Sequence, residues 1–197
     1  MDMISGKRIF PVFFVILIAI FLFSGSGTLS LGAQEALFPS YGSGTVEVRL
    51  YTDYFCPPCR SMEPEIEPIL KNLLKKKTIR LTFVDVPFNS KSPLYARYFL
   101  YSLAKKNDVE HAIHVRNILF EAATRQDVNT KEQTEKLLTS KGIAYVVWNT
   151  KPAFDRFNAM IKADKIDRTP TCVIVKRGKK EKYVGKPDII NALTGLK

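Results

Sequence analysis

The feature that most constrains this chain is a pair of cysteines placed between a strand pattern and a helix pattern. Residues 46–51 alternate apolar and polar side chains, which predicts a half-buried strand. After Cys56-Pro57-Pro58-Cys59, apolar residues recur at helical spacing between positions 62 and 74. The two cysteines therefore stand at the start of a helix that directly follows a strand.

The rest of the sequence predicts one α/β domain. A second strand is predicted at residues 79–86, and residues 92–163 are helical in pattern throughout. A strand at 172–176 turns back into a partner strand at 181–184, and a final helix begins near Pro187. The predicted order is β-α-β, a helical insertion, and then β-β-α.

Three short motifs mark helix ends inside the helical region. Ser92-Pro93 is expected to cap one helix start, with proline at the first helical position. Thr130-Lys131-Glu132-Gln133 fits a capping box, and Gly142 suits the end of the helix that follows it.

The N-terminal segment has the layout of a targeting sequence. Lys7 and Arg8 precede an apolar stretch at residues 9–23, which is shorter than the ~20 residues needed to cross a bilayer as a helix. Residues 1–33 are therefore predicted to be a signal peptide or an N-terminal membrane anchor. Either reading exports the remainder, which divides into a linker at 34–44 and a domain at 45–197.

Composition excludes several classes of protein. Hydrophobic residues make up 46% of the 197 residues and charged residues 25%, so neither wholesale disorder nor a polytopic membrane protein is expected. The net charge of +11 favours acidic partners or an anionic surface. No interleaving of aromatic and basic residues marks a nucleic-acid-binding module, so no nucleic-acid partner is predicted.

The cysteine pair indicates reversible disulfide chemistry. A thiol at a helix N-terminus meets the positive end of the helix dipole, which lowers its pKa and makes Cys56 the expected nucleophile. Cys59, one turn into the helix, is expected to be shielded and to resolve the mixed disulfide. Half of a zinc site and a permanent structural disulfide are alternatives. Cys172, which opens an apolar strand, is expected to be a buried core thiol, with a regulatory or substrate-linked thiol as the alternative.

Three motifs together resemble the thioredoxin superfamily, specifically its DsbA-like exported branch with a helical insertion. They are the segment 51–59 around the cysteines, Pro64 within the following helix, and Thr169-Pro170-Thr171 before the strand pair. The resemblance covers residues 45–195 and implies a thioredoxin fold with a central mixed sheet.

The resemblance also implies roles for individual residues. Cys56 and Cys59 would form the redox-active disulfide, with Cys56 as the nucleophile, and Pro170 would be a cis-proline. Phe55, Thr169 and Pro170 would contact the substrate. No cofactor is implied and no metal ligand is assigned. The partners would be cysteine-containing proteins and a membrane or soluble redox partner, with oxidation or general exchange favoured over reduction or isomerisation.

The sequence departs from this family at three places. Leu50 stands where many relatives carry a buried carboxylate that handles the proton of the second cysteine. Pro57 and Pro58 have no N–H groups, so the pKa of Cys56 is predicted to be lowered only moderately. Arg168 stands where relatives often have glycine, which predicts a more basic rim to the substrate groove.

A second hypothesis is copper handling by the same two cysteines. Thiolates at this spacing suit Cu(I), and His111 or His114 could supply a third ligand. Because these histidines lie three residues apart on a helical segment, they share a face, but their polar surroundings also fit ordinary surface residues.

Overall fold

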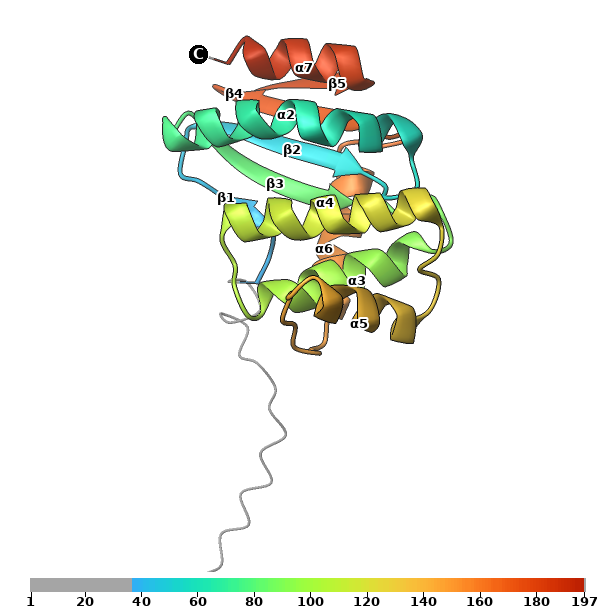
Figure 1. The fold of residues 1–197 in the computed structure, drawn as a ribbon. Helices are drawn as coiled ribbons and strands as arrows, with labels where there is room; N and C mark the ends of the chain where they lie inside the picture. Colours follow the sequence, from blue (N-terminus) through green and yellow to red (C-terminus); the bar gives the residue numbers. More distant parts are fainter. Residues whose placement is uncertain (1–36, 197) are drawn as a thin grey trace, which may run out of the picture.

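The structure, a computed structural model, describes residues 37–196. The elements follow the order that the sequence predicts, with one extra short strand at the start (Figure 1). The strands are β1 (Ser40–Tyr41), β2 (Val46–Thr52), β3 (Ile79–Asp85), β4 (Thr171–Lys176) and β5 (Lys179–Val184). The helices are α2 (Pro57–Lys75), α3 (Ser92–Leu103), α4 (Val109–Arg125), α5 (Lys131–Ser140), α6 (Lys151–Ala163) and α7 (Lys186–Thr194).

The strands form one mixed sheet in the order β1-β3-β2-β4-β5. β2 and β3 run parallel, whereas each of the other neighbouring pairs is antiparallel. A parallel pair needs a crossover connection, which α2 supplies, while β4 and β5 need only the tight turn at residues 177–178. The predicted α/β class with a central mixed sheet is therefore confirmed.

The helices lie on both faces of the sheet, as two neighbouring side chains of β2 show. The Thr52 hydroxyl accepts a hydrogen bond from Arg116 of α4 at 2.7 Å, whereas the Tyr51 hydroxyl donates to Asp164, just after α6, at 2.5 Å. Neighbouring side chains of a strand point to opposite faces, so α4 and α6 lie on opposite sides of the sheet. In Figure 1, α2 lies in front of the sheet and α6 behind it.

The core fills both sides of the sheet. On the side of α2, Leu50, Phe83 and Met62 are completely buried, and on the side of α6, Tyr51 and Phe157 are buried as well. Each large apolar side chain buried in this way contributes about 1.5–3 kcal/mol.

The helical insertion runs from the start of α3 to the end of α6, as predicted. The capping box at Thr130 and Gln133 is confirmed, with hydrogen bonds in both directions. The expected capping role of Ser92 is wrong, because Lys91 occupies the N-cap and the Ser92 hydroxyl donates instead to Asp53 at 2.8 Å. Residues 141–150 are not helical, and the Trp148 indole ties this segment to α3 through the Leu100 carbonyl oxygen at 3.1 Å.

The predicted linker at residues 34–44 is wrong over its described part. Ser40 and Tyr41 form β1, which pairs with β3, and Phe38 and Tyr41 are buried. A two-residue strand is too short to show alternation in a sequence, so the small residues around it dominate the pattern. The ordered domain therefore begins before residue 45.

The predicted signal peptide or anchor at residues 1–33 lies outside the described residues. Within residues 37–196, no helix is long and apolar enough to cross a membrane.

Candidate active site

Cys56 is the N-cap residue of α2, at the junction with β2. Its sulfur accepts a hydrogen bond from the backbone N–H of Cys59 at 3.4 Å. Pro57 and Pro58 occupy the first helical positions, where a missing N–H leaves no intrahelical bond unmade. Cys56 is half-buried and Cys59 is completely buried, so only the first sulfur of the pair can meet another protein.

The loop before β4 lies directly beside Cys56. The peptide bond between Thr169 and Pro170 is cis, as predicted. When it is protonated, the Cys56 thiol donates a hydrogen bond to the Thr169 carbonyl oxygen at 3.3 Å. The structure thus brings together the cysteine motif and the Thr-Pro motif that the sequence singled out.

The two thiols differ strongly in acidity. Hydrogen bonding from Cys59 lowers the pKa of the Cys56 thiol to about 6, despite the opposing effects of burial and of the nearby Asp53 carboxylate. Burial raises the pKa of the Cys59 thiol far above its ordinary value. At neutral pH the pair therefore consists of one thiolate and one thiol, which agrees with the moderate lowering predicted from the two prolines.

Asp53 organises the backbone around the cysteines. Its carboxylate is buried and accepts hydrogen bonds from the N–H of Phe55 at 2.7 Å and from the N–H groups of Phe88 and Asn89 at 3.0 Å each. With the Ser92 hydroxyl, four donors share its two oxygens. The sequence alone assigned no role to Asp53. Its position directly after a strand and before a loop is the signal that could have suggested this role.

Comparison with known proteins agrees with this geometry. A family model described as Thioredoxin matches residues 42–183. The chain belongs to the thioredoxin family. A search of the curated proteins found no match.

Solved structures of other proteins share this fold. A periplasmic thioredoxin-like protein from Salmonella enterica serovar Typhimurium is 18% identical, with a TM-score of 0.59 over 80% of this chain and 88% of that one. A variant of DsbA from Pseudomonas aeruginosa is 22% identical, with a TM-score of 0.62 over 78% and 85%. The catalytic domain of Proteus mirabilis ScsC is 16% identical, with a TM-score of 0.58 over 80% and 87%.

A buried ionic cluster beneath the active site was missed by sequence reasoning. Arg116 of α4 is completely buried and donates to Glu63 at 2.6 Å, to Asp85 at 3.0 Å and to Thr52 at 2.7 Å. Its guanidinium also lies over the ring of Phe83, 4.4 Å from the centroid. The signal was an arginine on the apolar face of a helix, which has to find carboxylates wherever the fold places them.

No acid stands at Leu50, and the buried acids of this cluster lie on α2 and β3 instead. Leu50 is completely buried and lies opposite Cys172 in the sheet. Glu63 is one turn after Cys59, so both side chains lie on the buried face of α2. The buried acid nearest to Cys59 in the chain therefore lies on α2 and not on β2.

The predicted histidine ligands lie away from the cysteines. Lys71 forms an ion pair with Glu110 at 2.6 Å, which places the His111 end of α4 twelve residues along α2 from Cys59, about 18 Å at 1.5 Å per residue. His114 is only one turn nearer. A copper site that combines the cysteine pair with either histidine is therefore wrong. Residues 37–196 contain no group of three or more His, Cys, Asp or Glu side chains placed to hold a metal ion.

Cys172 is a core thiol, as predicted. It is completely buried in β4, and burial raises its pKa to about 12. It therefore stays protonated and out of reach at neutral pH.

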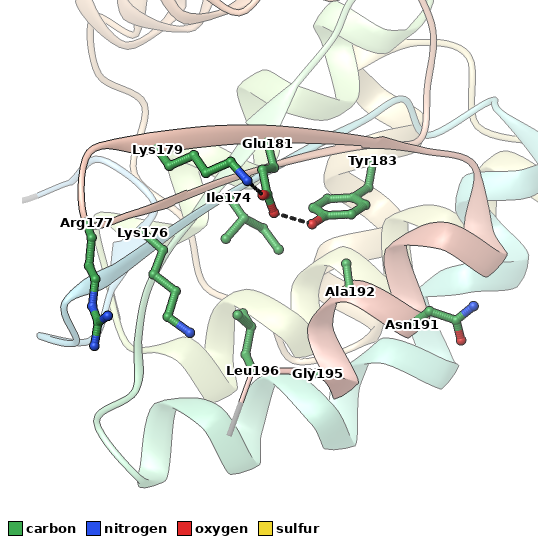
Figure 2. Close-up of a pocket in the computed structure, with 10 residues that line it drawn as sticks. All are labelled: Ile174, Lys176, Arg177, Lys179, Glu181, Tyr183, Asn191, Ala192, Gly195 and Leu196. Atoms are coloured by element: carbon green, nitrogen blue, oxygen red, sulfur yellow. Dashed lines mark hydrogen bonds and ion pairs between the residues drawn. The ribbon is translucent and has the colours of Figure 1, made fainter.

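A hollow of about 510 Å³ lies between the β4–β5 hairpin and α7 (Figure 2). Within it, the Glu181 carboxylate forms an ion pair with Lys179 at 2.7 Å and accepts a hydrogen bond from the Tyr183 hydroxyl at 2.5 Å. β4 runs from Thr171, beside the active site, to the turn at residues 177–178. The hollow therefore lies toward the far end of the sheet, and no cysteine lines it.

Proposed function

We propose that the protein is an exported thiol:disulfide oxidoreductase that exchanges disulfides with cysteine-containing proteins through Cys56 and Cys59. The observation that carries this proposal is the unequal pair of thiols: an accessible one with a pKa of about 6 and a buried one with a raised pKa. A thiolate of low pKa is a good leaving group as well as a nucleophile available at neutral pH.

In the oxidising direction, a client thiolate attacks Cys56 of the Cys56–Cys59 disulfide. The sulfur–sulfur bond breaks, and Cys59 leaves as a thiolate and takes up a proton. A second client thiolate then attacks the client sulfur of the mixed disulfide, which releases Cys56 as a thiolate and leaves the client oxidised. A redox partner, membrane-bound or soluble, resets the pair by accepting its two electrons through a disulfide of its own.

The surroundings of Cys56 support binding of an extended client chain. Phe55 directly precedes the nucleophile and is half-buried, and the Thr169 carbonyl oxygen lies 3.3 Å from the Cys56 sulfur. Backbone groups of the Thr169 loop would pair with the client in the manner of an added strand.

Two observations bear on the compartment. Export rests on the signal-like residues 1–33 and on the likeness in fold to a periplasmic protein.

The experiment is oxidation of a reduced, unfolded protein by the oxidised enzyme. We expect Cys56→Ser to abolish exchange. In Cys59→Ser, Cys56 should attack the disulfide of an oxidised client and release one client thiolate, and the resulting mixed disulfide should survive on a non-reducing gel. Cys172→Ala is the control and should retain the parent rate. Exchange by the Cys56→Ser variant at the parent rate would refute the proposal.

A further inference from the structure

A small cleft with two aromatic walls opens beside the reactive sulfur. Its volume is about 210 Å³, below the roughly 300 Å³ at which pockets begin to hold a small-molecule ligand. It is lined by Asp53, Phe55, Cys56, Phe88, Asn89 and Thr169. A space of this size beside a nucleophile suits one side chain of a bound polypeptide.

Phe88 is the unusual wall of this cleft. It is 54% exposed, and it is the one aromatic side chain in residues 37–196 that is exposed. Full burial of a phenylalanine is favourable by about 1.5–3 kcal/mol, so an exposed ring next to a reactive centre offers binding free energy to whatever covers it.

Asp53 fixes the two walls relative to each other. One carboxylate oxygen accepts from the N–H of Phe55, and the other accepts from the N–H groups of Phe88 and Asn89 and from the Ser92 hydroxyl. The Phe55 ring is held in addition by an edge contact with Tyr95, with 5.0 Å between the centroids. The walls are therefore held in place before any client arrives, which reduces the ordering cost of binding.

A cation stands at the rim of the cleft. The Lys91 ammonium lies 5.9 Å from the centroid of the Phe55 ring and would repel a lysine or an arginine. An uncharged apolar side chain does not meet this repulsion.

We propose that this cleft receives an apolar side chain next to the reacting cysteine of the client, and that Asp53 is the positioning residue that holds the cleft open. The inference rests on the proposed exchange function. Because Cys56 and Thr169 line the cleft themselves, the occupant lies within one or two residues of the client cysteine at about 3.3 Å per residue of extended chain.

The test is the rate of exchange with cysteine peptides that carry Leu, Ala or Lys beside the cysteine. We expect kcat/KM to be roughly tenfold higher for Leu than for Ala, the scale set by apolar pockets, with Lys the poorest. Phe88→Ala should reduce the Leu-over-Ala ratio to within about twofold of one. The control Val147→Ala removes a 62% exposed apolar side chain elsewhere and should keep the parent ratio.

The role of Asp53 is tested separately. Asp53→Asn should raise KM for the Leu peptide more than it lowers kcat, and should reduce the Leu-over-Ala ratio. Asp164→Asn changes a carboxylate that is also buried but lies behind the sheet, so it should keep that ratio. A global loss of packing would instead affect all peptides equally.

A trapped complex gives a readout that does not depend on rates. In Phe88→Trp combined with Cys59→Ser, the mixed disulfide with the Leu peptide should shift indole emission to shorter wavelength, and the Ala peptide should not. Equal rates for Leu and Ala, a preference for Lys, or an unshifted emission would overturn the inference. Absence of exchange with every peptide would instead refute the proposed function.

Discussion

The protonated thiol of Cys56 donates a hydrogen bond to the carbonyl oxygen of Thr169, across 3.3 Å and 113 residues of sequence. This contact joins the start of α2 to the loop before β4. A client that forms a disulfide with Cys56 is therefore brought directly against the backbone of the Thr169 loop.

The acidity of Cys56 gives the first prediction. Titration of the thiolate ultraviolet absorbance in reduced protein should show a midpoint near pH 6, because hydrogen bonding from Cys59 stabilises the charged sulfur. Cys59→Ala removes the side-chain part of that bonding and should raise the midpoint. Cys56→Ser should lack this transition, and a midpoint at the ordinary cysteine value in the parent would contradict the structure.

The reduction potential gives the second prediction. A pKa of about 6 lies between the roughly 7 of thioredoxin and the roughly 3.5 of DsbA. We therefore expect a potential between about −270 mV and about −120 mV, measured against glutathione. Pro58→His places a cation between the cysteines and should make the disulfide more oxidising, whereas Pro58→Ala should change the potential less. A parent value outside this interval would break the link between pKa and potential.

The third prediction concerns the buried arginine. Arg116→Met leaves Glu63 and Asp85 buried without their cation and should lower the free energy of unfolding by about 3–5 kcal/mol. Arg125→Met, which removes a surface ion pair with Glu121, should cost less than about 1 kcal/mol. Urea unfolding of both variants measures the two free energies. Equal decreases in the free energy of unfolding would show that the buried cluster stabilises the fold no more than a surface ion pair does.

The fourth prediction is a pH dependence of stability. Burial raises the pKa of Asp85 from 3.8 to about 6, so the native protein binds more protons than the unfolded chain between these values. The free energy of unfolding therefore falls as the pH rises through this window, by on the order of 3 kcal/mol from this group. Asp85→Asn should remove that contribution, as judged from urea unfolding at several pH values.

Asp164 supplies a control of opposite sign. Hydrogen bonds from Lys180, Tyr51 and Arg49 lower its pKa despite burial, so its contribution is present above the unfolded value and is lost as the pH falls. Asp164→Asn should therefore flatten a rising dependence where Asp85→Asn flattens a falling one. Identical changes in the two variants would contradict both assignments.

Features encoded locally were predictable from the sequence. The strand, the Cys56–Cys59 motif and the following helix are neighbours in the chain, and periodicity alone predicts the helical insertion at 92–163. The position of Pro170 beside Cys56 depends on how distant segments meet, and it came from resemblance to a family rather than from periodicity.

Features created by tertiary contact were not predictable. Arg116 meets Glu63 and Asp85 only after α4 has crossed both α2 and the end of β3. The exposure of Phe88 likewise follows from the bonds that Asp53 makes to a loop more than thirty residues away. Neither pattern has a period that a single helix or strand could reveal.

The burial of two of the three thiols has a practical consequence. An alkylating reagent applied to the folded, reduced protein should modify a single atom, the sulfur of Cys56, since Cys59 and Cys172 are both completely enclosed. Every covalent adduct, whether a probe or a captured client, would then have one connectivity and one orientation on the surface.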